Sequence, residues 1–243
     1  MLLPKGRFKV LQRYVGGMLE WRTYRRIYDE LKSRPDLDAV EVGAARGAGS
    51  IAAAMAYRDL RRRGRLIVVE KLERGSRSAD GTYMQNLNAI ESLFAAFKVT
   101  RHIQLYPKHI TMKNGEEVVR LIRTGQLSAL IHDADGRLDR DFFHFGPFLI
   151  DDAFVLIDDY EDRLDAKTLP DGTQVVYGKK RLTFQLLTLF AEWGLFVFDE
   201  VKDGTAFGRK PKGADWSRLD LNQCAEVVRA IRASCTTPSH PSA

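Results

Sequence analysis

Short runs of apolar residues alternate along the chain with longer segments in which apolar residues recur every three or four positions. The short runs are typical of buried strands, and the recurring pattern is typical of amphipathic helices. Leu66–Val69 is apolar throughout, as expected for a strand covered on both faces. Strands are predicted at 38–42, 66–70, 102–106, 128–132 and 154–157. A helix is predicted from the glycines after residue 42 to Arg63, where Gly64 closes it. Further helices are predicted at 84–97, 115–125, 142–149, 180–193 and 218–233. Loops are predicted at 71–82 and 161–178.

Late strands are predicted at 195–198 and 205–209. They are joined through Asp203-Gly204, which is short enough for an antiparallel hairpin. Strand and helix alternate through residue 193, which predicts an α/β fold with a doubly wound, mostly parallel sheet. The hairpin adds an antiparallel strand at one edge of that sheet.

Residues 5–34 form a basic, aromatic lead-in. Its apolar residues recur at helical spacing, at Tyr14, Met18, Trp21, Tyr24, Ile27, Tyr28 and Leu31. We expect a helix that packs across the domain, with a homodimer interface as one role and a cap over the substrate crevice as another. Pro35 ends the segment. The predicted organisation is therefore a helical lead-in at 1–35, one domain at 36–233 and a disordered tail, rich in Ser, Thr and Pro, at 234–243.

Composition and charge narrow the class of protein, its partners and its cellular compartment. A length of 243 residues fits one α/β domain, and the net charge of +6 comes partly from basic runs at 22–26 and 58–65. Such scattered charge favours solvated helix faces over a nucleic-acid site. Cys224 and Cys235 form neither a disulfide framework nor a metal-ligand pattern, which predicts a reducing, cytoplasmic setting. No apolar run is long enough to span a bilayer, so no membrane partner is expected.

The candidate chemistry begins in residues 38–50, which predict a strand, a tight glycine turn and a helix start. Three residues separate Gly43 from Gly47, so the spacing is not that of a dinucleotide fingerprint. Glu41 stands two residues before Gly43, where a carboxylate favours an ammonium group over a pyrophosphate. This pattern resembles motif I of the class I S-adenosylmethionine-dependent methyltransferases. Glu70 ends the next strand, where α/β nucleotide folds bind ribose hydroxyls.

Acids follow the fourth and fifth predicted strands: Asp133 and Asp135, then Asp158 and Asp159. The carboxyl ends of parallel strands meet at one edge of a sheet, so these carboxylates would repel one another without a cation. Oxygen ligands of this kind suit Mg²⁺ or another hard divalent cation. We therefore expect Asp133, Asp158 and Asp159 to bind a metal, and Asp135 to be a fourth ligand, a supporting group or a general base. Helix capping is the alternative role for such acids.

The segments Ile131–Asp135 and Leu156–Tyr160 resemble the cation-dependent small-molecule O-methyltransferases, nearest the macrocin-type sugar enzymes. The resemblance covers residues 38–160 and implies a seven-stranded, Rossmann-like sheet. It implies that S-adenosylmethionine is bound by Glu41, Gly43, Ala44, Gly47, Ser50, Glu70 and Asp133, with Glu70 at the ribose. It also matches Asp133, Asp158 and Asp159 to the Mg²⁺ positions.

This chain departs from that family at two places. Gly136 stands where the family often has a histidine, and Pro107-Lys108-His109 stands where it usually offers an acid near the adenine. The general base therefore stays open among His132, His109 and His144. The catalytic candidates are Asp133, Asp135 and His132.

The predicted function is transfer of a methyl group from S-adenosylmethionine to a hydroxyl of a small, polyhydroxylated, sugar-like acceptor, assisted by Mg²⁺. We expect the acceptor to meet side chains at Tyr160, Arg163, Tyr177, Lys179 and Lys180. One alternative is a cofactor-binding protein that has lost catalysis. Another is a nucleic-acid methyltransferase, but the chain lacks an Asn-Pro-Pro-Tyr-type tetrapeptide after the fourth strand and a motif cysteine. A nicotinamide oxidoreductase ranks lower because the glycine spacing differs.

Overall fold

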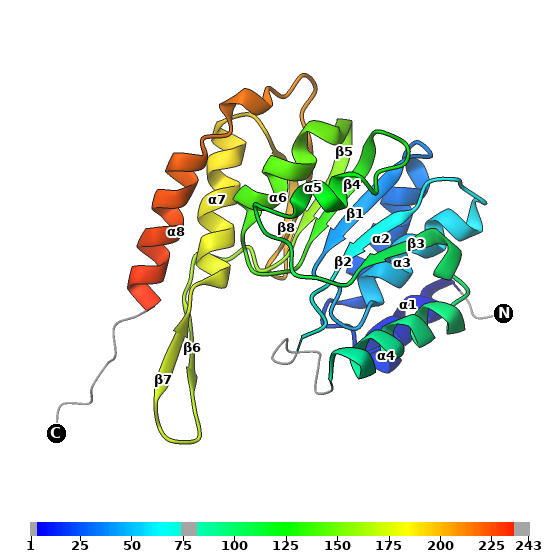
Figure 1. The fold of residues 1–243 in the computed structure, drawn as a ribbon, viewed down its shortest axis with the longest axis horizontal. Coiled ribbons are helices and arrows are strands. Elements are labelled where there is room, and N and C mark those ends of the chain that lie inside the picture. The colour runs from blue at the N-terminus through cyan, green and yellow to red at the C-terminus, as the bar shows by residue number, and fades with distance from the viewer. Residues whose placement is uncertain (1–3, 74–81, 236–243) are drawn as a thin grey trace.

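The computed structural model describes residues 4–73 and 82–235 (Figure 1). A seven-stranded sheet forms its centre. Its strands are β1 (Asp38–Val42), β2 (Leu66–Val69), β3 (Ile103–Tyr106), β4 (Leu127–His132), β5 (Leu149–Ile157), β8 (Val197–Lys202) and β9 (Thr205–Arg209). The strand order is β3-β2-β1-β4-β5-β9-β8; the first five strands are parallel, and β9 is antiparallel to both of its neighbours. The predicted doubly wound sheet with a C-terminal hairpin is confirmed.

Helices cover both faces of the sheet (Figure 1). One face carries α1 (Pro4–Tyr14), α2 (Trp21–Ser33), α3 (Ala48–Asp59) and α4 (Tyr83–Ala96). The other carries α5 (Gly115–Val119), α6 (Leu138–Phe145), α7 (Lys179–Glu192) and α8 (Leu221–Cys235). Short 3₁₀ helices lie at Thr100–His102, Gly146–Phe148 and Trp216–Arg218. Among the described residues, no helix has the length and apolar character needed to cross a bilayer.

The register of the central strands explains where a site can form. Val42 of β1 pairs with Val69 of β2 and with His132 of β4, and His132 pairs with Ile157 of β5. These strands therefore end level with one another. The residues that follow them stand in one row at the edge of the sheet: Gly43, Glu70, Asp133 and Asp158.

Several predicted helix ends are wrong, because backbone conformation and contacts with distant residues determine where the helices end. α3 stops at Asp59, since Arg61 adopts a left-handed backbone with φ of +54°. Gly64 is not its cap; its amide donates to Asp36 Oδ1 at 2.9 Å, and a β-carbon there would overlap the carbonyl of Leu37. α5 ends at Val119 instead of 125, and α6 begins at 138 instead of 142.

The lead-in is two helices instead of one. The chain turns between them at Gly16, with φ of +77°, and at Gly17, where a β-carbon would overlap the Tyr24 hydroxyl. Tyr14 and Met18 are consequently exposed, at 81% and 57%, although they were expected on the apolar face. Of the rest of the stripe, Trp21 is half-buried and the other residues are buried within this chain, so the stripe offers no support for the predicted homodimer interface.

The segment 161–178, predicted as a loop, contains a separate antiparallel hairpin of β6 (Asp165–Thr168) and β7 (Gln174–Tyr177). In Figure 1 this hairpin projects from the body of the molecule below α7. β8 runs from 197 to 202, later than the strand predicted at 195–198. Most of the predicted loop at 71–82 and of the predicted disordered tail lies outside the described residues.

Candidate active site

The glycine turn after β1 places Glu41 in a fully buried position. The start of α3 packs directly over its carboxyl, since a β-carbon at Gly49 would overlap Glu41 Oε1. The Ser50 hydroxyl donates to Glu41 Oε2. Burial raises the pKa of Glu41 to about 8, although the Ser50 hydrogen bond opposes the rise. A cationic group beside this carboxyl would therefore favour its ionised form.

Gly43 is required at the first position of the turn. Its φ is +87°, and a β-carbon would overlap the carbonyl oxygen of Asp133 at the end of β4. Glu70, at the end of β2, fixes the next residues: its Oε2 accepts hydrogen bonds from the amides of Ala44 at 2.9 Å and Ala45 at 2.8 Å. Glu70 also lines a cavity at this edge of the sheet, which is described below.

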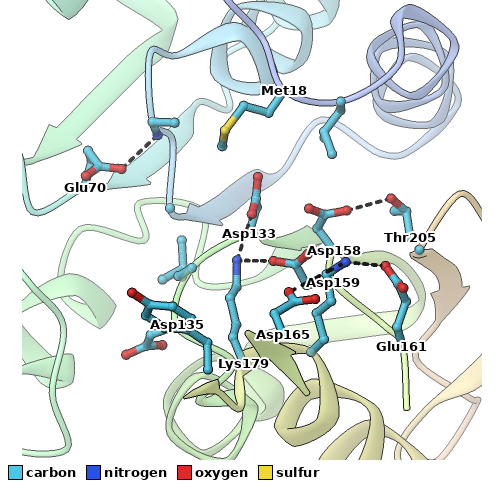
Figure 2. Close-up of a pocket in the computed structure, with 18 of the residues that line it drawn as sticks. Met18, Glu70, Asp133, Asp135, Asp158, Asp159, Glu161, Asp165, Lys179 and Thr205 are labelled. Carbon is cyan, nitrogen blue, oxygen red and sulfur yellow. Dashed lines mark hydrogen bonds and ion pairs between the residues drawn. The ribbon is translucent and has the colours of Figure 1, made fainter. Parts of the chain in front are cut away.

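The carboxylates of Asp133, Asp158 and Asp159 converge at the ends of β4 and β5 (Figure 2). One oxygen from each lies within 4.8 Å of the others, and we call this group the carboxylate triad. Thr205 of β9 donates through Oγ1 to Asp158 Oδ1 at 2.7 Å. Asp159 has a left-handed backbone with φ of +59°, a conformation that costs about 1–3 kcal/mol and persists only where the surrounding structure holds it.

Lys179, the first residue of α7, points its ammonium into the triad (Figure 2). Nζ lies 2.6 Å from Asp159 Oδ2 and 3.3 Å from Asp133 Oδ1. Burial raises the pKa of Asp133 to about 7 against the opposing charge of Lys179, and the neighbouring aspartates add to the rise. The pKa of Lys179 is itself raised, because Asp133 and Asp159 outweigh the effect of burial. The triad therefore concentrates negative charge, and it already binds a cation of this chain, the Lys179 ammonium.

A buried network holds Asp135 beside the triad. Arg140 binds it through both terminal nitrogens, at 2.9 and 3.0 Å, and donates through Nε to Asp141 Oδ1 at 2.7 Å. Asp141 Oδ2 lies 2.7 Å from Nδ1 of His132. Although burial acts in the opposite direction, the Arg140 pair holds the pKa of Asp135 far below its usual value. Asp135 is therefore a permanent carboxylate.

A cavity of about 960 Å³ connects these groups. Met18, Leu19 and Glu20, from the turn before α2, line it beside the carboxylates. The β6–β7 hairpin contributes Asp165, Ala166, Lys167 and Tyr177 to the opposite part of the lining. The lead-in and the hairpin thus both belong to the walls of the cavity.

The structure brings most of the predicted site residues together. The cavity is lined by Gly43, Glu70, Asp133, Asp135, Asp158 and Asp159. Glu41 and Ala44 line a small adjoining void of about 20 Å³, whereas Gly47 lies beside Phe94 and Ile90, and Ser50 is fully buried.

The three candidate histidines lie in different places. His132 is fully buried beneath the site, and its Nε2 has no hydrogen-bond partner among the described residues. His144 is buried against Gly115. His109 lines the cavity, with Nε2 4.0 Å from Asp135 Oδ2. Of the three, His109 is the histidine within reach of a ligand.

No protein-family model matches the chain, and no curated protein matches it significantly. Solved structures match its fold. The O-methyltransferase TomG from Streptomyces achromogenes, in complex with S-adenosylmethionine, is 13% identical with a TM-score of 0.59; the match covers 87% of this chain and 91% of TomG.

The methyltransferase PaMTH1 from Podospora anserina, bound to S-adenosylhomocysteine, is also 13% identical; the TM-score is 0.61, and the match covers 87% of this chain and 89% of PaMTH1. An O-methyltransferase from Bacillus cereus, in complex with S-adenosylhomocysteine, is 11% identical with a TM-score of 0.55, over 85% of this chain and 90% of that one. The chain therefore has the fold of class I S-adenosylmethionine-dependent methyltransferases, and the predicted resemblance is confirmed at the level of the fold.

Proposed function

We propose that this chain is an S-adenosylmethionine-dependent O-methyltransferase that acts on a hydroxyl of a small, polyhydroxylated, sugar-like acceptor with the help of Mg²⁺ or another hard divalent cation. The observation that carries the proposal is the row of Gly43, Glu70, Asp133 and Asp158 at the ends of four adjacent parallel strands. Ligands of open α/β sheets bind at this edge. The methyltransferases among the fold neighbours support the same reaction class.

On the cofactor side, S-adenosylmethionine supplies the methyl group on a sulfonium centre. The amides of Ala44, Ala45 and Leu72 already donate to the Glu70 carboxylate. Its remaining lone pairs would accept the hydroxyls of a ribose. Glu41, which lines the adjoining void, would pair with the cofactor's ammonium in its ionised form. The glycine turn presents main-chain groups between these two acids.

On the acceptor side, the residues present fit a hard cation, since the triad offers oxygen ligands only and already draws in an ammonium. Asp133, Asp158 and Asp159 would hold the metal, which would lower the pKa of an acceptor hydroxyl. Asp135, a permanent carboxylate, would accept a hydrogen bond from a second hydroxyl. His109 is the candidate to take up the proton.

The size of the cavity is consistent with two ligands. Typical ligand pockets measure about 300–1,000 Å³, and this one, at about 960 Å³, is at the upper end of that range. The part between the triad and the β6–β7 hairpin has charged groups of both signs, including Glu161, Asp165, Lys167 and Lys180. This mixture suits an acceptor rich in hydroxyl groups.

Calorimetric titration with S-adenosylmethionine and S-adenosylhomocysteine, with and without Mg²⁺, tests the proposal. We expect micromolar binding in the wild type and a loss of at least about tenfold in Glu70→Ala, since a charged hydrogen-bond partner is removed. Glu70→Gln keeps one acceptor oxygen for the amides of Ala44 and Ala45, so the turn keeps its shape. This variant therefore tests the contribution of the Glu70 charge to cofactor binding alone. Glu226→Ala, on the exposed side of α8, is the control.

Asp158→Ala tests the metal assignment in the same experiment. We expect this variant to bind S-adenosylhomocysteine but to lose Mg²⁺ binding. Absence of cofactor binding in the wild type would contradict the methyltransferase proposal. Cofactor binding without transfer to any hydroxylated acceptor would indicate a binding protein that has lost catalysis.

A further inference from the structure

Lys179 gives the carboxylate triad a cation of its own. Its ammonium contacts an oxygen of Asp159 at 2.6 Å and an oxygen of Asp133 at 3.3 Å. Asp158, the third member, accepts from the Thr205 hydroxyl instead. Every member of the triad is therefore already engaged with a group of this chain.

The ammonium and a divalent ion cannot share this place without rearrangement. The side chains of Asp133 and Asp159 are only 14% and 18% exposed, so little water screens the charges between them. A metal ion held by the triad would lie within a few ångströms of Nζ, where two cations repel strongly. It would also need carboxylate oxygens that Lys179 now occupies.

The Lys179 side chain is free to leave without a change in the fold. Its main chain begins α7, and its stem lies beside Gly136 in the turn after β4, where a β-carbon would come 3.6 Å from Lys179 Cγ. A lysine stem has several rotatable bonds, so its ammonium can move by several ångströms while α7 stays in place. Lys180, the next residue, is engaged elsewhere, with Nζ 2.6 Å from Glu161 Oε1.

We propose that Lys179 is a built-in cation that holds the carboxylate triad in the absence of metal and competes directly with a divalent ion for Asp133 and Asp159. This inference rests on the proposed metal site and deepens it. Lys179 is thus a positioning residue: it sets how tightly metal binds, and its ammonium turns toward the acceptor cavity when the metal enters.

A Mn²⁺ titration of the full-length protein tests this, with free Mn²⁺ followed by electron paramagnetic resonance. We expect Lys179→Met to bind Mn²⁺ at least about tenfold more tightly than the wild type, because the competing charge is gone. Lys179→Arg, which keeps the charge, should bind as weakly as the wild type. Lys180→Met makes the same change in net charge one residue away and should also match the wild type.

Three outcomes would overturn the proposal. These are equal affinities in Lys179→Met and the wild type, equal tightening in Lys179→Met and Lys180→Met, and no Mn²⁺ binding in any of the proteins. A titration of the same samples with S-adenosylhomocysteine keeps the two proposals apart. If S-adenosylhomocysteine binds and Lys179→Met has the same Mn²⁺ affinity as the wild type, the role of Lys179 is refuted and the methyltransferase proposal stands.

A measurement on the wild type covers the case in which Lys179→Met does not fold. Acetylation by acetic anhydride, followed by mass spectrometry, reports how accessible each lysine ammonium is. We expect saturating Mn²⁺ to raise the acetylation rate of Lys179 several-fold and to leave that of Lys180 unchanged. Equal rates for Lys179 with and without Mn²⁺ would contradict the proposal.

Discussion

Glu41 is the residue whose burial has the clearest consequence for pH dependence. Its pKa is raised to about 8 by burial, against about 4.3 in an unfolded chain. Between these values the folded protein holds a proton that the unfolded chain has released. The contribution of this group to stability therefore falls as the pH rises from about 4.3 towards 8.

Replacing Glu41 with Gln should remove this pH dependence. Gln keeps an oxygen for the Ser50 hydroxyl but does not ionise. We expect the gain in unfolding free energy, relative to the wild type, to be larger at pH 8 than at pH 5, by up to a few kcal/mol. Urea unfolding at both pH values measures it, with Glu226→Gln as an exposed control. The same offset at both pH values would show that Glu41 does not titrate in this range.

Arg140 is the second residue with a sharp prediction. It is buried between Asp135 and Asp141, so Arg140→Met leaves the fully buried Asp141 carboxylate with the His132 imidazole alone and without its guanidinium partner. Breaking a buried pair in this way costs about 3 kcal/mol or more. We expect a loss of that size in urea unfolding at pH 7, and no measurable loss in Arg120→Met, whose pair with Glu116 is exposed. Equal stabilities would mean that the network contributes nothing to the fold.

Among the elements, the β6–β7 hairpin is the candidate for recognising the acceptor. Lys167 and Tyr177 line the cavity from this hairpin, while Thr168, next to Lys167, does not. Successive side chains of a strand point to opposite faces, which makes Thr168 a matched control.

We expect Lys167→Ala and Tyr177→Ala to raise the KM for the acceptor several-fold and to leave the affinity for S-adenosylhomocysteine unchanged. Thr168→Ala should behave as the wild type in both measurements. Steady-state kinetics with a hydroxylated acceptor that the enzyme methylates and calorimetry with S-adenosylhomocysteine provide the two readouts. A weaker cofactor affinity in the hairpin variants would instead assign the hairpin to the cofactor side.

The buried strands could be predicted from the sequence, whereas the projecting β6–β7 hairpin could not. β1, β2 and β4 are buried along their whole length, and most of their residues are apolar or small. β6 and β7 are largely exposed, and their apolar run is limited to the three residues Val175–Tyr177, so their segment was predicted as a loop. Helix ends depended on tertiary contacts, such as those of Gly64 with Asp36 and Leu37, that no local pattern contains.

Site residues could be predicted where they directly follow a strand that the sequence pattern indicates. Asp133 and Asp158 were found because each directly follows a recognisable strand. Lys179 was predicted as an acceptor contact, and its place in the triad was missed, although the sequence held a signal: α7 begins with Lys179-Lys180-Arg181 and has no acid in its first turn. Cations at a helix N-terminus oppose the helix dipole, so such a cluster indicates acids elsewhere in the fold that compensate it.

At the scale of the whole molecule, the lead-in helices are part of the core. Phe8 and Leu11 of α1, with Ile27 and Leu31 of α2, join the same buried cluster as α3. Polar contacts support this packing: the Tyr28 hydroxyl donates to Asp59 Oδ2, at the end of α3, at 2.9 Å. The lead-in therefore cannot be removed without opening one face of the sheet.

Ile27→Ala tests this role. Ile27 is fully buried, and removing its side chain beyond the β-carbon should lower the unfolding free energy by about 2–4 kcal/mol. Tyr14→Ala, at 81% exposure on the neighbouring helix, should change it little. Urea unfolding compares the two. The turn before α2 also lines the cavity. Ile27→Ala should loosen this turn and thereby weaken S-adenosylhomocysteine binding. If Ile27→Ala were as stable as the wild type, the lead-in would pack on the domain without stabilising it, and its proposed role in stability would be refuted.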